Sequence, residues 1–150
     1  IDVSHMNEKA FWDTARHSSS PLVATHSNAH TLCPQPRNLT DHQLLAIRDS
    51  GGVAGVNFGN AFLRADGKRD SDTPLSTIVR HIDYLINIMG DDHVALGSDF
   101  DGITLPDDLR DVSGLPRLIS ALRDSGYDQF VLNKLLWGNW QKVLQNVWQQ

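Results

Sequence analysis

Cysteine is nearly missing from these 150 residues, and so are long apolar runs and any excess of basic charge. The single cysteine, Cys33, excludes an internal disulfide framework, fits a reducing compartment and predicts a cytoplasmic protein. No apolar run approaches the ~20 residues that cross a bilayer, so we expect no membrane segment in this chain. The formal net charge is -5, so the chain has no excess of positive charge and we do not expect it to bind nucleic acid. What remains is a globular domain, and its 40% hydrophobic content can supply a core.

Two further absences concern the start of the chain and its motifs. The sequence opens at Ile1, inside a strand-like run, without an initiator methionine, a helix cap or a signal peptide. We therefore expect the middle of a larger protein, whose upstream part was removed or is carried on a separate chain, and a periplasmic or anchored form stays open. No Gly-x-Gly-x-x-Gly follows a strand, which argues against a doubly wound nucleotide-binding domain.

Strand-like and helix-like segments alternate along the chain, which is typical of parallel α/β architecture. The expected strands are residues 1–5, 21–26, 53–58 and 93–97, and the expected helices are residues 7–17, 41–50, 74–89, 115–125 and 129–149. A (β/α)8 TIM-type barrel needs ~250 residues, so four such units with additional C-terminal helices predict half a barrel. A free-standing four-stranded doubly wound sheet is the structural alternative, but it leaves the abrupt start unexplained.

Local signals support several of these helices. Thr40 and Gln43 have the spacing of a capping box, with Thr40 at the N-cap. Thr73-Pro74 predicts an N-cap followed by the first helical residue. In the last helix four large apolar residues recur at spacings of three or four and are expected to face the core. They are Trp137, Trp140, Leu144 and Trp148.

Residues of metal-site type follow three of the expected strands. His5 and His26 each end an apolar run, and Asp99 follows another, just before Asp101. The carboxyl ends of successive parallel strands meet at one rim, where α/β proteins carry their chemistry, and imidazole is a good zinc ligand. Taken singly, each histidine is more often a hydrogen-bonded loop residue, Ser4-His5-Met6 resembles a tag scar, and Asp101-Gly102 suits a turn. Their recurrence at one point of a repeated unit favours a hydrolytic metal site.

Several different short motifs are distributed along the whole chain. They are Asp2–His5, Pro21–Ala29, Cys33-Pro34, Pro36–Asp41, Gly51–Val53, Val56–Phe58, His81–Asp83, Gly97–Gly102 and Gly138-Asn139. On these residues, and on the 21-residue spacing from His5 to His26, the chain resembles the C-terminal half of the renal (membrane) dipeptidase family. That family consists of zinc peptidases with a barrel like that of metal-dependent amidohydrolases. The resemblance implies that residues 1–150 are the C-terminal half of a dipeptidase barrel.

The resemblance also implies roles for individual residues. His5 and His26 look like ligands of the second zinc of a binuclear site, and Asp99 looks like the proton carrier beside it. Arg37 looks like the group that holds a substrate carboxylate, and Asn57 would lie at the rim of the substrate pocket. The ligands of the first zinc and a bridging glutamate would belong to the N-terminal half, as a separate chain or as part of the same one.

The expected function is zinc-dependent hydrolysis of dipeptides, with two zinc ions per complete barrel and a possible homodimer. These 150 residues would be inactive alone, because they would supply only part of the metal shell. The alternative is a non-catalytic half-barrel remnant or subunit that assembles with a partner chain, and metal content separates the two. Position favours Asp99 over Asp101 as proton carrier, because Asp99 comes directly after the apolar run.

Overall fold

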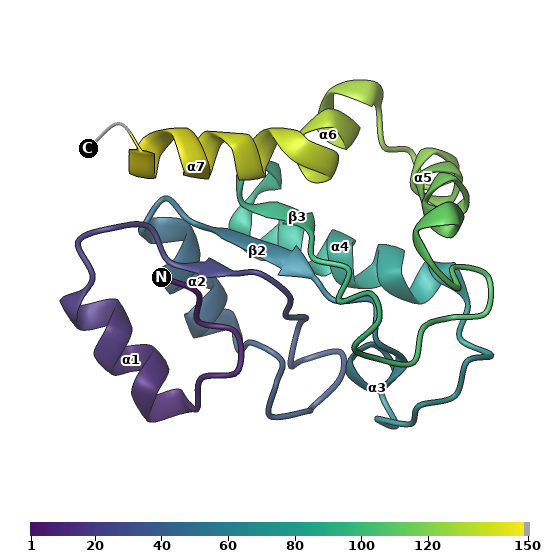
Figure 1. Cartoon of the computed structure of the whole chain (residues 1–150), viewed down its shortest axis with the longest axis horizontal. Coiled ribbons are helices and arrows are strands. Elements are labelled where there is room, and N and C mark those ends of the chain that lie inside the picture. Colours follow the sequence, from purple (N-terminus) through teal and green to yellow (C-terminus); the bar gives the residue numbers. More distant parts are fainter. Residues whose placement is uncertain (149–150) are drawn as a thin grey trace.

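The computed structural model of the protein describes residues 1–148 and shows a mixed α/β fold (Figure 1). Three parallel strands form one sheet in the order β1 (Val23–Ala24), β2 (Val53–Val56) and β3 (Val94–Leu96). The register pairs Val23 with Val53 and Ala54 with Val94. Parallel neighbours need a crossover connection, and each crossover here carries a helix, α2 (Asp41–Asp49) between β1 and β2 and α4 (Leu75–Met89) between β2 and β3.

The first expected strand, residues 1–5, is reduced to a single residue pair. Asp2 makes one parallel bridge with Val23, so the described residues contain three strands and this bridge in place of four strands. The local reason is a turn, because Asp2 Oδ1 accepts a hydrogen bond from Ser4 N at 3.0 Å. His5 then adopts a left-handed conformation with φ 70°, which ends the extended run. The bridge still places residues 1–5 beside β1, as expected for two successive parallel strands.

Helices fill most of the remaining chain. They are α1 (Glu8–His17), α2 (Asp41–Asp49), α3 (Asn60–Leu63), α4 (Leu75–Met89), η1 (Asp91–His93), η2 (Val112–Gly114), α5 (Leu115–Asp124), α6 (Gln129–Asn133), a π-helical turn η3 (Lys134–Gly138) and α7 (Asn139–Trp148). The Thr40 capping box is confirmed. The expectation at Thr73 is wrong by one residue: Pro74 is the N-cap, because the Thr73 hydroxyl donates to Asp70 O at 2.6 Å. Within residues 1–148 no helix has both the length and the apolar character to cross a bilayer.

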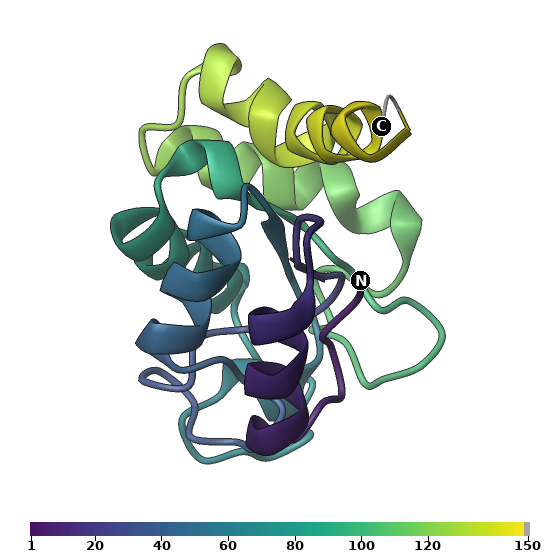
Figure 2. The same ribbon diagram turned by 90° about the vertical axis from the view of Figure 1, so that its left-hand side faces the viewer.

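The two faces of the sheet pack against different helices. Ala54 of β2 and Val94 of β3 belong to the main core, together with buried residues of α2 and α4. Successive side chains of a strand point to opposite faces, and the neighbouring residues Val53 and Ala95 pack instead on Val143 of α7. Figures 1 and 2 both place α7 along the top of the molecule, well above α2. The loops that follow the carboxyl ends of the strands contain the residues of the candidate site.

The last helix departs from expectation in two ways. It is not one helix from 129 to 149 but α6, the π-helical turn and α7, and Gln149 lies outside the described residues. Its expected apolar face is also not in the core, because Trp137 is 56% exposed and Trp148 is 75% exposed. Trp140 is half-buried and donates from Nε1 to Leu96 O at 3.0 Å.

A shift in helical phase explains this difference. A π-helical turn inserts an extra residue, so a stripe counted at α-helical spacing slips to one side after it. Asn139 fixes the new phase, because its Nδ2 donates to Asp91 O and to Val94 O, both at 2.7 Å. Asn139 and Val143 are consequently the buried residues of α7. The segment is helical, as its spacing predicts, but the hydrogen bonds of Asn139 decide which face of α7 points inward.

Candidate metal centre

His5 and His26 lie in direct contact. Their Nε2 atoms are 2.9 Å apart and their ring centroids 5.0 Å apart. His26 follows β1, and His5 follows the short bridge beside it, so neighbouring strand ends bring the two rings together. His5 holds its ring there from a left-handed backbone conformation, which costs a non-glycine residue of order 1–3 kcal/mol and is concentrated at functional sites. Their role as metal ligands stays a prediction.

The proton on His26 is placed by its neighbours. Thr25 Oγ1 lies 2.8 Å from Asp2 Oδ2 and 2.7 Å from His26 Nδ1. An ionised carboxylate only accepts hydrogen bonds, so the single hydroxyl proton of Thr25 goes to Asp2. Thr25 Oγ1 must then accept from His26 Nδ1–H. His26 therefore presents the lone pair of Nε2, and an outer hydrogen bond of this kind is what orients metal-ligating histidines.

The electrostatics of the site agree with these protonation states. Burial alone would raise the pKa of Asp2, but hydrogen bonds donated by Ser4 and Thr25 outweigh it and lower the pKa, so Asp2 is ionised. Burial lowers the pKa of His26; the charge of Asp99 opposes this shift and that of Arg37 adds to it. His26 is therefore favoured in its neutral form, the form that binds metals.

Arg37 makes His5 an acceptor as well. Its Nη2 lies 3.2 Å from His5 Nε2 and 3.4 Å from the carbonyl oxygen of His26. A guanidinium carries only donors, so His5 Nε2 must accept. Two acceptor nitrogens then face each other at 2.9 Å, an arrangement that is repulsive unless a proton or a cation lies between them.

The donor pair fits zinc. Two nitrogen ligands at about 2.0–2.1 Å in a tetrahedral site lie about 3.3 Å apart, so the rings need to separate by only a few tenths of an ångström. The shell is incomplete, because residues 1–148 contain no cluster of three or more histidine, cysteine, aspartate or glutamate side chains able to hold a metal. Within residues 1–148 these two histidines are thus candidate ligands, and a complete zinc site would need further ligands from outside them.

Asp99 stands at the third strand end, held by Asn57. Asn57 Nδ2 donates to Asp99 Oδ2 at 2.9 Å, and Asn57 Oδ1 accepts from Gly59 N at 2.7 Å. Asn57 is 1% exposed and both ends of its amide are used, so it positions Asp99, while its contact with substrate stays a prediction. Asp99 has a left-handed backbone with φ 66°, as Asp101 does with φ 68°. The charge of Asp99 acts on His26, whereas the side chain of Asp101 is exposed.

Two buried residues without a role in the sequence reasoning support the site. Asn28 is fully buried; its Nδ2 donates to Asn57 O at 2.9 Å, and its Oδ1 accepts from Asn57 N at 2.9 Å. His81 of α4 accepts from Ala29 N at 3.2 Å and donates from Nε2 to Leu63 O at 3.0 Å. Burial lowers the pKa of His81 to about 4. Both fall inside the family motifs, and that was the only signal that could have singled them out.

Fold and site together define an α/β protein with two facing histidines and a positioned carboxylate at the carboxyl ends of its parallel strands. The sequence model of the membrane dipeptidase family, peptidase family M19, matches residues 1–150. The chain belongs to this family.

Individual relatives agree with the family match. A Klebsiella pneumoniae protein named only as an uncharacterized protein in the pqqA 5' region is 85% identical over 150 residues, which are 100% of this chain and 55% of that protein. The dipeptidase ataJ of Aspergillus terreus is 35% identical over 98% of this chain and 36% of its own length.

A solved structure of a related protein has closely the same fold. The crystal structure of a metallo peptidase from Rhodobacter sphaeroides, liganded with a phosphinate mimic of the dipeptide L-Ala-D-Ala, has a TM-score of 0.95 and 52% identity. The match covers 97% of this chain and 41% of that chain. This chain therefore spans about half, or less, of the length of the proteins it matches.

Proposed function

We propose that the complete protein is a zinc-dependent dipeptidase and that residues 1–150 form the C-terminal half of its (β/α)8 barrel. The observation that carries the proposal is the pair of acceptor nitrogens of His5 and His26, which face each other at 2.9 Å beside a guanidinium and a carboxylate. Family membership supports it, as does the related peptidase that binds a phosphinate dipeptide mimic. A phosphinate has a tetrahedral phosphorus where a peptide has its scissile carbonyl carbon.

His5 and His26 would hold one of two zinc ions through their Nε2 atoms, with the further ligands supplied by the other half of the barrel. Bound zinc would lower the pKa of a water and polarise the scissile carbonyl. The metal would thus supply the nucleophile at neutral pH. Thr25 and Asp2 keep His26 in the tautomer that can bind it.

The remaining steps belong to side chains of this chain. Arg37 would bind the C-terminal carboxylate of a short substrate by paired hydrogen bonds, which selects dipeptides over longer peptides. Asp99 would take the proton of the attacking water and return it to the leaving amine. Asn57 occupies Asp99 Oδ2, so Oδ1 is the oxygen left to carry that proton. The other half of the barrel would be part of the same polypeptide or a separate chain.

The test is metal content and turnover of the full-length protein. We expect two zinc ions per barrel by plasma mass spectrometry and hydrolysis of Ala-Ala dipeptides, with the L-D and L-L forms assayed separately. His26→Ala should lose zinc and activity, whereas His42→Ala on the exposed side of α2 should lose neither. A protein that binds no zinc and cleaves no dipeptide would instead be the non-catalytic remnant. That alternative is supported by the lack of a third candidate metal ligand beside the two histidines within residues 1–148.

A further inference from the structure

A cavity of about 510 Å³ is lined by residues that contact Asn57 and Arg37, two neighbours of the candidate metal centre. It is formed between α3 and the loops that contain Arg69 and Ile103. Gly59 connects the two places, because a Cβ atom built on it would lie 3.0 Å from Asn57 Oδ1, 2.8 Å from Ile103 Cδ1 and 3.2 Å from Phe62 Cδ2. The wall of the cavity therefore touches the amide that positions Asp99.

Phe62 provides a second connection. Its ring lines the cavity and also lies under Arg37, whose guanidinium carbon is 5.6 Å from the ring centroid. The group proposed to hold the C-terminal carboxylate of the substrate thus rests on a wall of the cavity. A side chain attached to that same C-terminal residue would be the part of the substrate nearest the cavity.

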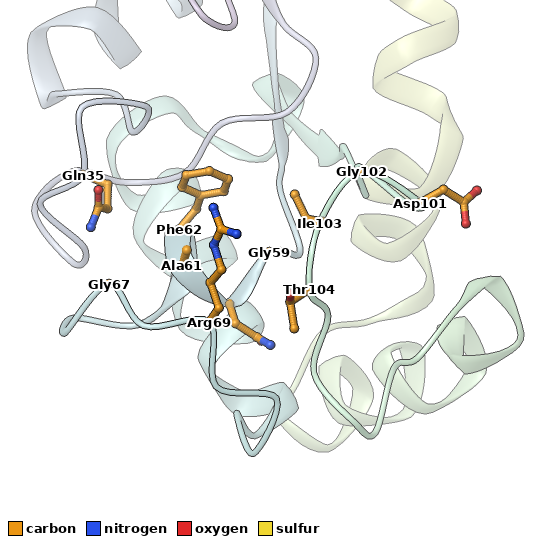
Figure 3. Close-up of a pocket in the computed structure, with 11 residues that line it drawn as sticks. Gln35, Gly59, Ala61, Phe62, Gly67, Arg69, Asp101, Gly102, Ile103 and Thr104 are labelled. Carbon is orange, nitrogen blue, oxygen red and sulfur yellow. The ribbon is translucent and has the colours of Figure 1, made fainter.

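The cavity is lined by an arginine that forms no ion pair within residues 1–148. Arg69 is exposed and forms no ion pair or side-chain hydrogen bond with any residue in the range 1–148. The nearby carboxylates are engaged by Arg64, which lies 2.8 Å from Asp66 and 4.0 Å from Asp70. Figure 3 shows the Arg69 side chain extending toward Phe62, across from Ile103 and Thr104, while the Asp101 carboxylate points away.

We propose that this cavity is a subsite for an acidic side chain, with Arg69 as the residue that selects it. The substrates would be dipeptides ending in aspartate or glutamate, whose C-terminal carboxylate is held by Arg37 and whose side-chain carboxylate is held by Arg69. Phe62 and Ile103 would enclose the methylene groups between them. This inference rests on the proposed dipeptidase function.

The test compares Ala-Asp with its neutral isostere Ala-Asn on the full-length protein, using both enantiomers of the C-terminal residue. We expect kcat/KM to favour Ala-Asp, and Arg69→Gln to lower that preference about tenfold through the rate on Ala-Asp alone, since one charged hydrogen bond is lost. Lys68→Gln is the matched control, because it removes an exposed charge one residue away that does not line the cavity. Arg69→Glu should move the preference toward Ala-Lys.

Equal rates on Ala-Asp and Ala-Asn in the unmodified protein, or an unchanged preference in Arg69→Gln, would overturn the subsite and leave a dipeptidase. Failure to cleave any dipeptide would overturn the proposed function instead.

Discussion

Thr25→Val is the most informative single substitution, because it tests the proposed metal centre without replacing either proposed ligand. Valine has nearly the shape of threonine but cannot accept from His26 Nδ1 or donate to Asp2. Asp2 keeps two backbone donors, Ser4 N at 3.0 Å and Thr25 N at 3.1 Å, so the loop retains its turn. The imidazole of His26, by contrast, loses the partner that fixes its tautomer and orientation.

The expected size of the effect follows from that loss. Removing an outer hydrogen bond to a metal-ligating histidine typically lowers metal affinity 10–100-fold, or about 1.4–2.7 kcal/mol. The assay is zinc affinity of the full-length protein by competition with a chelator, with Thr31→Val as an exposed threonine control. Zinc affinity equal to that of the unmodified protein would refute the tautomer argument, and an equal loss in Thr31→Val would show that the effect is not local.

Three more substitutions test the remaining roles. Asp99→Asn should lower kcat by roughly 10²–10⁴ with zinc retained, whereas Asp101→Asn should stay near normal; the reverse pattern would transfer the proton carrier to Asp101. Arg37→Ala should raise KM for dipeptides with little change in Tm, and a large fall in Tm would make it a structural residue. His81 is buried with its pKa lowered from 6.5 to about 4, so between these values the unfolded chain binds a proton that the folded chain does not. The free energy of unfolding should therefore reach its maximum with respect to His81 above pH 6.5. It should fall by about 3 kcal/mol on acidification to pH 4. His81→Gln should flatten this slope in urea titrations while His42→Gln leaves it, and an unchanged slope in His81→Gln would contradict the assignment.

Sequence reasoning succeeded where the cause is local. The Thr40 capping box needs only two side chains three residues apart, and it forms as expected. The ends of the parallel strands follow from apolar runs and their breakers, and this places His5, His26 and Asp99 in the loops at one rim. These features depend on short stretches of chain that carry the same information in any context.

It failed where distant residues decide. The exposed Trp137 and Trp148 follow from a π-helical turn and from the anchoring of Asn139 to carbonyls of the 91–94 segment. The reduction of the first strand depends on Asp2, whose carboxylate also binds Thr25, 23 residues away. The amide of Asn57 turns toward Asp99, 42 residues later. No periodicity in the sequence records such contacts.

Anomalous diffraction at the zinc edge, from crystals of the full-length protein loaded with zinc, tests the central claim most directly. The account predicts a zinc ion about 2.0–2.1 Å from Nε2 of both His5 and His26, with His26 Nδ1 still bonded to Thr25. A zinc ion bound elsewhere, with the two rings remaining in direct contact at 2.9 Å, would contradict it.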